Sequence, residues 1–214
     1  MSTDSTLSTN PAFNINCRQC ERLAHFLDEV KDKHPSYFCK PVPAFGDANA
    51  QLVIVGLAPG MHGANKTGRP FTGDYAGLLL YETLYKYGFA TTPVSVSADD
   101  GLQLINCRIS NAVKCLPPDN KPLPAEINNC NQYIAAELNA LKAGSVMLAL
   151  GNVAHAAVLK AFDLKLKDYK FAHAARHALP NGLVLYDSYH CSRYNTQTKR
   201  LTEAMFHEVF VRIA

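Results

Sequence analysis

The sequence lacks several features that would place it in a particular class of protein. Its 214 residues contain no apolar run near the roughly 20 residues that a membrane-crossing helix requires. The N-terminal stretch is rich in Ser, Thr and Asn and has no apolar segment, so it is not a secretory signal. The sequence has no internal repeats, and its formal net charge is only +3. We therefore expect a disordered lead-in over residues 1–12 and one globular domain over residues 13–214, without membrane association.

The cysteine content argues against a disulfide framework. Seven cysteines, an odd number, occur in a chain without a secretory signal. Four of them form a close pair, Cys17 and Cys20, and a wider pair, Cys115 and Cys130. Four thiolates in this arrangement fit zinc or an iron–sulfur cluster, and spacing alone favours zinc because four-cysteine zinc sites are common. The other three are predicted to be free thiols, with Cys107 the main rival ligand: Cys39, Cys107 and Cys191.

Short apolar runs alternate with helical patterns along the chain. The runs predict buried strands over residues 51–55, 102–109, 146–150 and 183–186. Apolar residues at helical spacing predict helices over residues 18–33, 76–87, 124–141, 153–162 and 198–213. This alternation predicts an α/β fold, a three-layer sandwich with a central, mostly parallel four-stranded sheet flanked by helices.

The unusual segments all follow the predicted strands. They are residues 56–77, 117–124, 151–152 and 188–195. Ligands of parallel α/β sheets bind beyond the carboxyl ends of the strands. The spacing therefore predicts where the site lies, and leaves its chemistry open.

The first of these segments is a glycine-rich loop. Six of the twelve glycines lie between Gly56 and Gly77, a density that lets backbone amides approach a ligand closely. The loop has neither the Gly-Lys-Ser/Thr of a phosphate-binding Walker loop nor a Gly-x-Gly-x-x-Gly motif. Taken by itself, the loop still allows nucleotide binding of another type.

Three segments together resemble the type 5 uracil-DNA glycosylases. Residues 56–74, GLAPGMHGANKTGRPFTGD, are similar to the first signature of that family, and residues 188–202, SYHCSRYNTQTKRLT, to the second. Residues 111–122, NAVKCLPPDNKP, resemble a middle motif. The resemblance implies a monofunctional DNA glycosylase that hydrolyses the N-glycosidic bond of uracil, and also of hypoxanthine and other deaminated or damaged bases. The product would be an abasic site in base excision repair.

The resemblance implies a role for four residues. Asp74 would position a water and offset charge on the sugar, although sequence alone equally supports a helix N-cap. His190 would donate a hydrogen bond to the departing base, where a lone histidine is otherwise structural. Phe71 would stack on a base taken out of the helix, and its alternative is a core aromatic. Asn120 would orient water or contact the base, and its alternative is turn chemistry.

Other residues would shape the pocket. Ala58 stands where better-known uracil glycosylases carry a water-activating Asp or Asn, which implies a less exacting pocket. His173 and His177 are expected only to line the edge of the site. The remaining predicted substrate-binding residues are Gly60, Gly63, Asn65, Ser192, Arg193 and Asn195.

The resemblance also implies a cofactor and a partner. In type 4 and type 5 glycosylases the four paired cysteines hold a [4Fe–4S] cluster, which reverses the preference for zinc and would be structural. The partner would be DNA, bound by a cytoplasmic monomer, associated with the nucleoid in a bacterium. A helix N-terminus near Thr198 could bind phosphate. The predicted basic contacts, whose alternative is a solvated surface, are Lys66, Arg69, Arg193, Lys199 and Arg200.

Two other functions stay open at this stage. One is a non-catalytic iron–sulfur protein that binds DNA or senses redox state, although such a protein would need neither Asp74 nor His190. The other is a phosphate-binding α/β enzyme, which the missing Gly-Lys-Ser/Thr disfavours.

Overall fold

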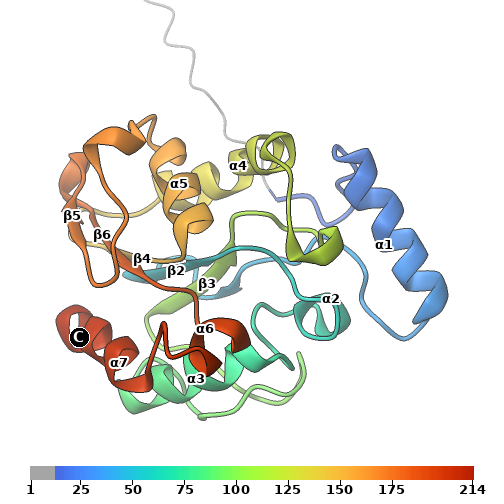
Figure 1. The fold of residues 1–214 in the computed structure, drawn as a ribbon, viewed down its shortest axis with the longest axis horizontal. Coiled ribbons are helices and arrows are strands. Elements are labelled where there is room, and N and C mark those ends of the chain that lie inside the picture. Colours follow the sequence, from blue (N-terminus) through green and yellow to red (C-terminus); the bar gives the residue numbers. More distant parts are fainter. Residues whose placement is uncertain (1–12) are drawn as a thin grey trace, which may run out of the picture.

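The computed structural model describes residues 13–214, so the predicted lead-in over residues 1–12 lies outside the described residues. Six strands form one sheet in the order β1-β3-β2-β4-β6-β5 (Figure 1). The inner four are parallel, and both edge strands are antiparallel. The strands are β1 (Phe45–Gly46), β2 (Leu52–Gly56), β3 (Cys107–Asn111), β4 (Val146–Leu150), β5 (Arg176–Ala178) and β6 (Val184–Ser188).

The predicted three-layer α/β fold is confirmed, but the predicted number of four strands is wrong. The two additional strands, β1 and β5, have two and three residues and lie at the edges of the sheet. Strands this short carry no apolar run, so periodicity cannot reveal them. The predicted strand 102–109 is also too long at its start. Residues 103–105 pair with residues 89–91 outside the sheet, through Thr91 N to Gln103 O and Ile105 N to Phe89 O.

Helices cover both faces of the sheet. Figure 1 shows α4 and α5 on one face, α3 and α7 on the other, and α1 at the side. Side chains of β2 alternate between the two cores: Leu52 and Ile54 join the α3/α7 side, whereas Val53 and Val55 join the α4/α5 side. The helices are α1 (Glu21–Lys33), α2 (Ala64–Thr67), α3 (Tyr75–Lys86), α4 (Pro124–Asn139), α5 (Asn152–Ala161), α6 (Arg193–Gln197) and α7 (Glu203–Ile213).

The predicted closing helix over residues 198–213 is two separate helices. Lys199 has a φ of 55°, which ends the helical path after the five-residue α6. The final helix, α7, begins at Glu203 and is capped by Thr202, whose Oγ1 accepts from Met205 N at 3.2 Å. The predicted helix N-terminus near Thr198 is therefore wrong, and with it the phosphate site proposed there. Within residues 13–214, no helix has the length and apolarity needed to cross a membrane.

The glycine-rich loop is fastened by a buried arginine. The Arg69 side chain is 4% exposed, and its Nη2 lies 2.6 Å from Asp100 Oδ2. Its Nε donates to Thr72 Oγ1 at 2.8 Å. Arg69 was expected to contact DNA. This prediction is wrong, because the guanidinium is buried and paired with Asp100 inside the protein. Burial alone would raise the pKa of Asp100, but hydrogen bonds from Arg69 and from backbone amides outweigh it and lower the pKa.

We expect Asp100→Asn to lower the free energy of unfolding by about 3–5 kcal/mol at neutral pH, because it leaves the buried Arg69 charge unpaired. Because the pKa of Asp100 is lowered in the folded state, its contribution is present above the unfolded value. The contribution should fade as the pH falls below about 4. Urea denaturation at neutral and acid pH measures both effects. Asp99→Asn, at an exposed neighbouring carboxylate, is the control, and equal effects of the two variants would contradict the prediction.

Candidate active site

A pocket of about 430 Å³ opens beyond the carboxyl ends of the parallel strands, where the sequence predicts the site. It is lined by residues from all four unusual segments. The predicted site residues that line it are Ala58, Gly60, Phe71, Asp74, Asn120, His190, Ser192 and Arg193. Residues from 58 to 193 thus converge on one cavity.

Phe71 forms the inner wall of the pocket. It is only 6% exposed and packs with the core, so it is a core aromatic and a pocket residue at once. Its φ is 54°, a conformation that a bulky residue adopts only when its surroundings impose it. The Phe71 ring lies 5.9 Å from the His190 ring, centroid to centroid, with 27° between their planes.

Asp74 is a helix cap and a pocket residue. Its Oδ1 accepts from Gly77 N at 2.8 Å, which caps α3 as the sequence alone allows. Its second oxygen, Oδ2, is not used by this cap and lies on the Gly60 and Gly63 side. Burial raises the pKa of Asp74, and hydrogen bonds from two backbone amides partly offset the rise. One oxygen of this pocket-lining carboxylate is thus engaged in the helix cap, and the other is left out of the cap.

His190 follows β6 and is half-buried. Burial lowers its pKa to about 4, so the ring is neutral at neutral pH. Its carbonyl oxygen accepts from Asn195 Nδ2 at 2.8 Å. Asn195 therefore fixes the backbone of His190, and it is not itself among the pocket-lining residues.

Of three other predicted substrate-binding residues, two line the pocket and one is buried in the protein. Ser192 lines the pocket, and its Oγ also caps the short helix α6 by accepting from Asn195 N at 3.4 Å. Arg193 lies at the pocket with its guanidinium 5.5 Å from the centre of the Tyr75 ring. Asn65 does not reach the cavity, because it is fully buried and its Nδ2 donates to Cys39 Sγ at 3.4 Å.

Gly63 supports the pocket from behind. A Cβ at this position would lie 2.5 Å from Asp74 Cβ and 2.6 Å from Asp74 Oδ2. At Gly60 the nearest atom would be Asp74 Oδ2 at 3.6 Å, an ordinary contact. The close approach of the loop to Asp74 therefore requires glycine at residue 63, whereas residue 60 has room for a Cβ.

Sequence reasoning missed Asn111 as a site residue. It ends β3, lines the pocket, and its buried Oδ1 has no hydrogen-bond partner. A buried polar atom without a partner is rare and marks a position where a ligand can supply the bond. Its place at the carboxyl end of a predicted strand, inside the middle motif, was the available signal. His177 was expected at the edge of the site, but it lies elsewhere and bonds Asp187.

The four paired cysteines line a separate cavity between α1 and α4. Burial, and then the neighbouring sulfurs of the other three, raise the pKa of Cys115. Two of the sulfurs also have N–H donors: Lys114 N at 3.2 Å from Cys130, and Asn129 Nδ2 at 3.8 Å from Cys20. The rival ligand Cys107 is fully buried in β3, away from this cavity.

The spacing of the sulfurs bears on what they could hold. One tetrahedral zinc ion would bring four sulfurs to within about 4 Å of one another. Among residues 13–214, His155, His177 and Asp187 are the one group of three or more potential ligand atoms within 4.8 Å of one another. No three of the four cysteine sulfurs lie within 4.8 Å of one another, so they are not gathered around one point as the ligands of a single bound zinc ion are.

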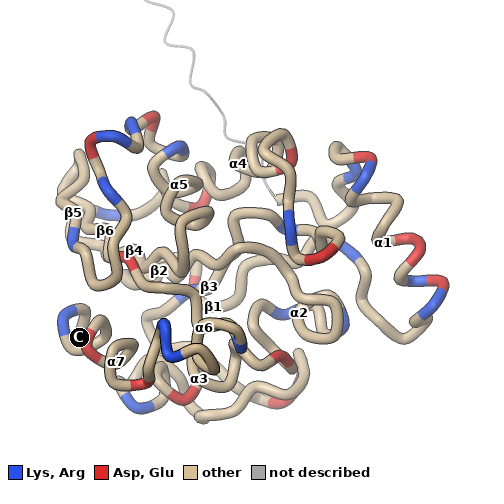
Figure 2. Tube along the Cα trace, in the orientation of Figure 1, with Lys and Arg blue, Asp and Glu red and all other residues tan. Residues whose placement is uncertain are grey.

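The basic residues are distributed, as Figure 2 shows, over several sides of the molecule, with basic segments beside α6. Lys66, Lys199 and Arg200 are exposed, unlike Arg69. With Arg193, they leave four of the five predicted cations accessible to a polyanion.

Comparisons with known proteins agree with the resemblance in the motifs. Residues 43–214 match the sequence profile of the Uracil DNA glycosylase superfamily. A Thermus thermophilus protein named type-5 uracil-DNA glycosylase is 44% identical over 200 residues, which cover 91% of both chains. A Pyrobaculum aerophilum protein of the same name is 40% identical, over 94% of this chain and 88% of its own. A type-4 uracil-DNA glycosylase of Archaeoglobus fulgidus is 33% identical, over 71% of this chain and 62% of its own.

We expect Gly63→Ala to lower the free energy of unfolding by about 1–3 kcal/mol, because the added methyl group overlaps Asp74. Gly60→Ala, in the same loop, has room for the methyl group and should change stability far less. Urea denaturation of both variants measures the difference. A Gly63→Ala protein as stable as Gly60→Ala would show that the loop does not press against Asp74.

Proposed function

This chain belongs to the Uracil DNA glycosylase superfamily, among its type-5 members, and we propose that it excises uracil from DNA as a monofunctional glycosylase. The observation that carries the proposal is the convergence of Phe71, Asp74 and His190 on one pocket at the carboxyl edge of the sheet. A non-catalytic DNA-binding protein would need no such arrangement. The product would be an abasic site for base excision repair.

Cleavage of the N-glycosidic bond places positive charge on the sugar and negative charge on the departing base. Asp74 supplies a carboxylate whose Oδ2 is free of the helix cap, so it can position water and offset the sugar cation. His190, neutral at neutral pH, keeps one ring N–H that it can donate to the base oxygen that gains charge. Burial strengthens both interactions because the local dielectric is low.

The base itself would meet one aromatic face and two amides. Phe71 offers the face, since a base taken out of the duplex needs a stacking partner. Asn111 has a buried unpartnered Oδ1, which can accept from a base N–H. Asn120, exposed at the rim with a φ of 55°, can reach water or the base. Because Ala58 adds no polar group, we propose that hypoxanthine and other deaminated bases also fit.

DNA would lie across the mouth of the pocket. Arg193 stands at the mouth, and Lys66, Lys199 and Arg200 are exposed cations that can bind phosphates without reading sequence. We propose that the protein acts as a monomer.

The four cysteines would hold a [4Fe–4S] cluster. The donor set is four sulfurs, two with N–H donors, at a spacing wider than one zinc ion requires. The cluster would link Cys17 and Cys20, at the start of α1, to Cys115 and to Cys130 of α4. Its contribution would be structural, because it is the base pocket that carries the residues for hydrolysis.

The test is excision from labelled oligonucleotides containing G·U, A·U, single-stranded U or hypoxanthine, with and without alkali. We expect wild-type protein to give strand cleavage only after alkali. Asp74→Asn should lose about 10²–10⁴-fold in rate while it keeps the helix cap through its amide oxygen. His190→Ala should lose about 10²–10³-fold.

The exposed His25→Ala is the matched control and should excise like wild type. Abasic product from neither uracil nor hypoxanthine, with DNA binding intact, would favour the binding or redox-sensing alternative. Cleavage without alkali would contradict the monofunctional assignment.

We expect purified protein to contain iron and acid-labile sulfide in equal amounts, with the broad visible absorption of a cluster. Cys17→Ser and Cys115→Ser should each lose both the metal and the absorption. Cys39→Ser, at a half-buried thiol outside the cavity, should keep them. One zinc ion per chain, without sulfide, would contradict the cluster and leave the four-cysteine site intact.

A further inference from the structure

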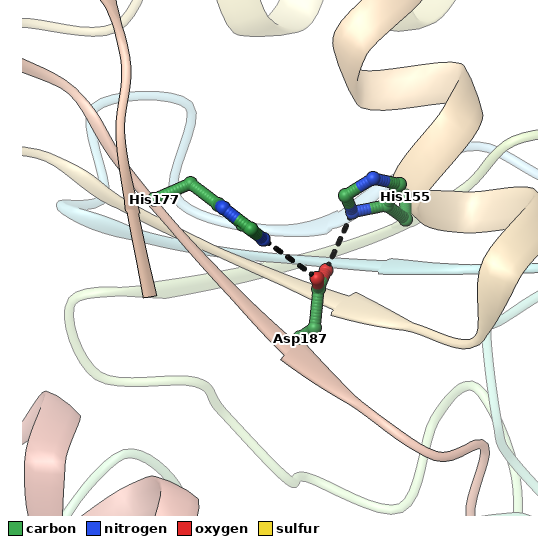
Figure 3. A group of neighbouring side chains, drawn as sticks. All are labelled: His155, His177 and Asp187. Carbon is green, nitrogen blue, oxygen red and sulfur yellow. Dashed lines mark hydrogen bonds and ion pairs between the residues drawn. The ribbon is translucent and has the colours of Figure 1, made fainter. Parts of the chain in front are cut away.

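A buried carboxylate, outside the set of residues that line the pocket, lies between two histidines. Asp187 is on β6, His155 on α5 and His177 on β5, and Figure 3 shows both imidazole rings directed at the carboxylate. His155 Nδ1 lies 2.8 Å from Asp187 Oδ1, and His177 Nε2 lies 3.0 Å from Oδ2. The three residues thus tie the helix α5 to the neighbouring strands β5 and β6.

The charge of Asp187 has to be balanced inside the protein. Its side chain is 0% exposed, and its ion-pair partners within residues 13–214 are these two histidines, with no lysine or arginine among them. Burial of an unpaired carboxylate is costly. A positive charge on one of the two imidazoles would balance it directly.

The hydrogen bonds identify His155 as that imidazole. Its Nε2 lies 2.9 Å from the carbonyl oxygen of Tyr169, which can only accept, so Nε2 carries a proton. Its Nδ1 faces the Asp187 carboxylate, which also accepts, so Nδ1 carries a proton as well. Burial would lower the pKa of His155, but the Asp187 carboxylate and the Tyr169 carbonyl outweigh it and raise the pKa.

A metal ion is the other occupant to consider, since the three ligand atoms lie within 4.8 Å of one another. Each imidazole, however, meets a different oxygen of Asp187, which is the pattern of two hydrogen bonds to one carboxylate. Structural zinc sites also take four protein ligands, and this group offers three. The hydrogen-bonded pair is therefore favoured, and zinc becomes an outcome of the test.

The group holds β6 just before the active-site residue. The backbone of Asp187 is fixed on the β5 side, where its N–H donates to Ala175 O at 3.0 Å and its carbonyl accepts from Ala174 N at 2.9 Å. Its side chain adds the tie to α5 through His155. His190 follows three residues later, so a shift of Asp187 would move the ring in the pocket.

We propose that His155 and Asp187 form a buried imidazolium–carboxylate pair that positions His190 at the pocket. His155 and Asp187 are positioning residues and touch no substrate. The consequence for excision rests on the proposed function, whereas the protonation of His155 can be measured without it.

The pair should be sensitive to alkaline pH. The titratable groups facing His155 are Asp187 on β6 and His177 on β5. The Phe171 ring, 5.6 Å away, covers it with an apolar edge. As the pH rises through the raised pKa, His155 loses a proton and with it one of its two hydrogen bonds. The stabilisation is thus present below the ordinary histidine pKa and is lost above the raised one.

The direct test is nitrogen NMR of the imidazole rings in the full-length, cluster-loaded protein, with His155 assigned by comparison with His155→Asn. We expect both ring nitrogens of His155 to stay protonated at a pH above the ordinary histidine pKa of about 6.5. A singly protonated ring at that pH would overturn the pair. So would bound zinc that a chelator removes with a change in the His155 signals.

The functional test uses variants that separate charge from shape. His155→Asn places an amide N–H near Nδ1 but does not titrate. Wild-type kcat for uracil excision should fall about tenfold between neutral and alkaline pH, with the apparent pKa seen by NMR. In His155→Asn the alkaline fall should vanish, whereas Asp187→Asn should lower kcat about tenfold at neutral pH with little change in KM.

His25→Asn, an exposed histidine, should reproduce the wild-type profile. An unchanged alkaline fall in His155→Asn would overturn the positioning role. Absence of excision by wild type would instead overturn the proposed function, and the NMR result would still decide whether the pair exists.

Discussion

The close approach of the glycine-rich loop to the ends of β2 and β3 is the constraint on which the site depends. Gly56 ends β2, and a Cβ there would lie 2.4 Å from Asn111 Oδ1 and 2.6 Å from Phe71 Cζ. The missing side chain lets the Phe71 ring enter the space above the strand. The ring then packs on the core from one side and forms the pocket wall on the other. Any larger residue at position 56 would push Phe71 into the cavity where a base would stack.

This approach needs anchors, and the fold supplies them on both sides of Phe71. Before it, Arg69 is held by Asp100 and Thr72, so the loop cannot lift from the surface. After it, Asp74 caps α3 and presses on Gly63. A positive φ at Phe71 is the local strain that these anchors sustain. Polar groups buried at such a site are therefore part of the fold as well as of the proposed chemistry.

Sequence patterns predict the layers and the place of the site because both follow from local periodicity. The strands β2 and β4 are apolar on both faces, and their predicted bounds agree with the structure to within a residue. Sequence patterns do not predict the environment of a side chain when that environment depends on a residue far away in the chain. The sequence around Arg69 predicts a surface cation, but in the structure Arg69 is buried and paired with Asp100, 31 residues later. His155 and Asp187 lie 32 residues apart on a helix and a strand, so no spacing rule could join them. Edge strands of two or three residues exist only through pairing with their neighbours.

Environment gives the two histidines beside β6 opposite charge states. His190 has burial without a compensating carboxylate, so its pKa falls to about 4 and the ring stays neutral. His155 is also buried, but a carboxylate and a carbonyl oxygen hold both its protons and raise its pKa. In the proposed reaction, a neutral ring can still donate one N–H to the departing base, and it needs no carboxylate beside it. A charged partner suits a buried Asp187 that would otherwise be unpaired. Exchanging these environments would charge the pocket and leave Asp187 uncompensated, so the position of each histidine relative to β6 decides its role.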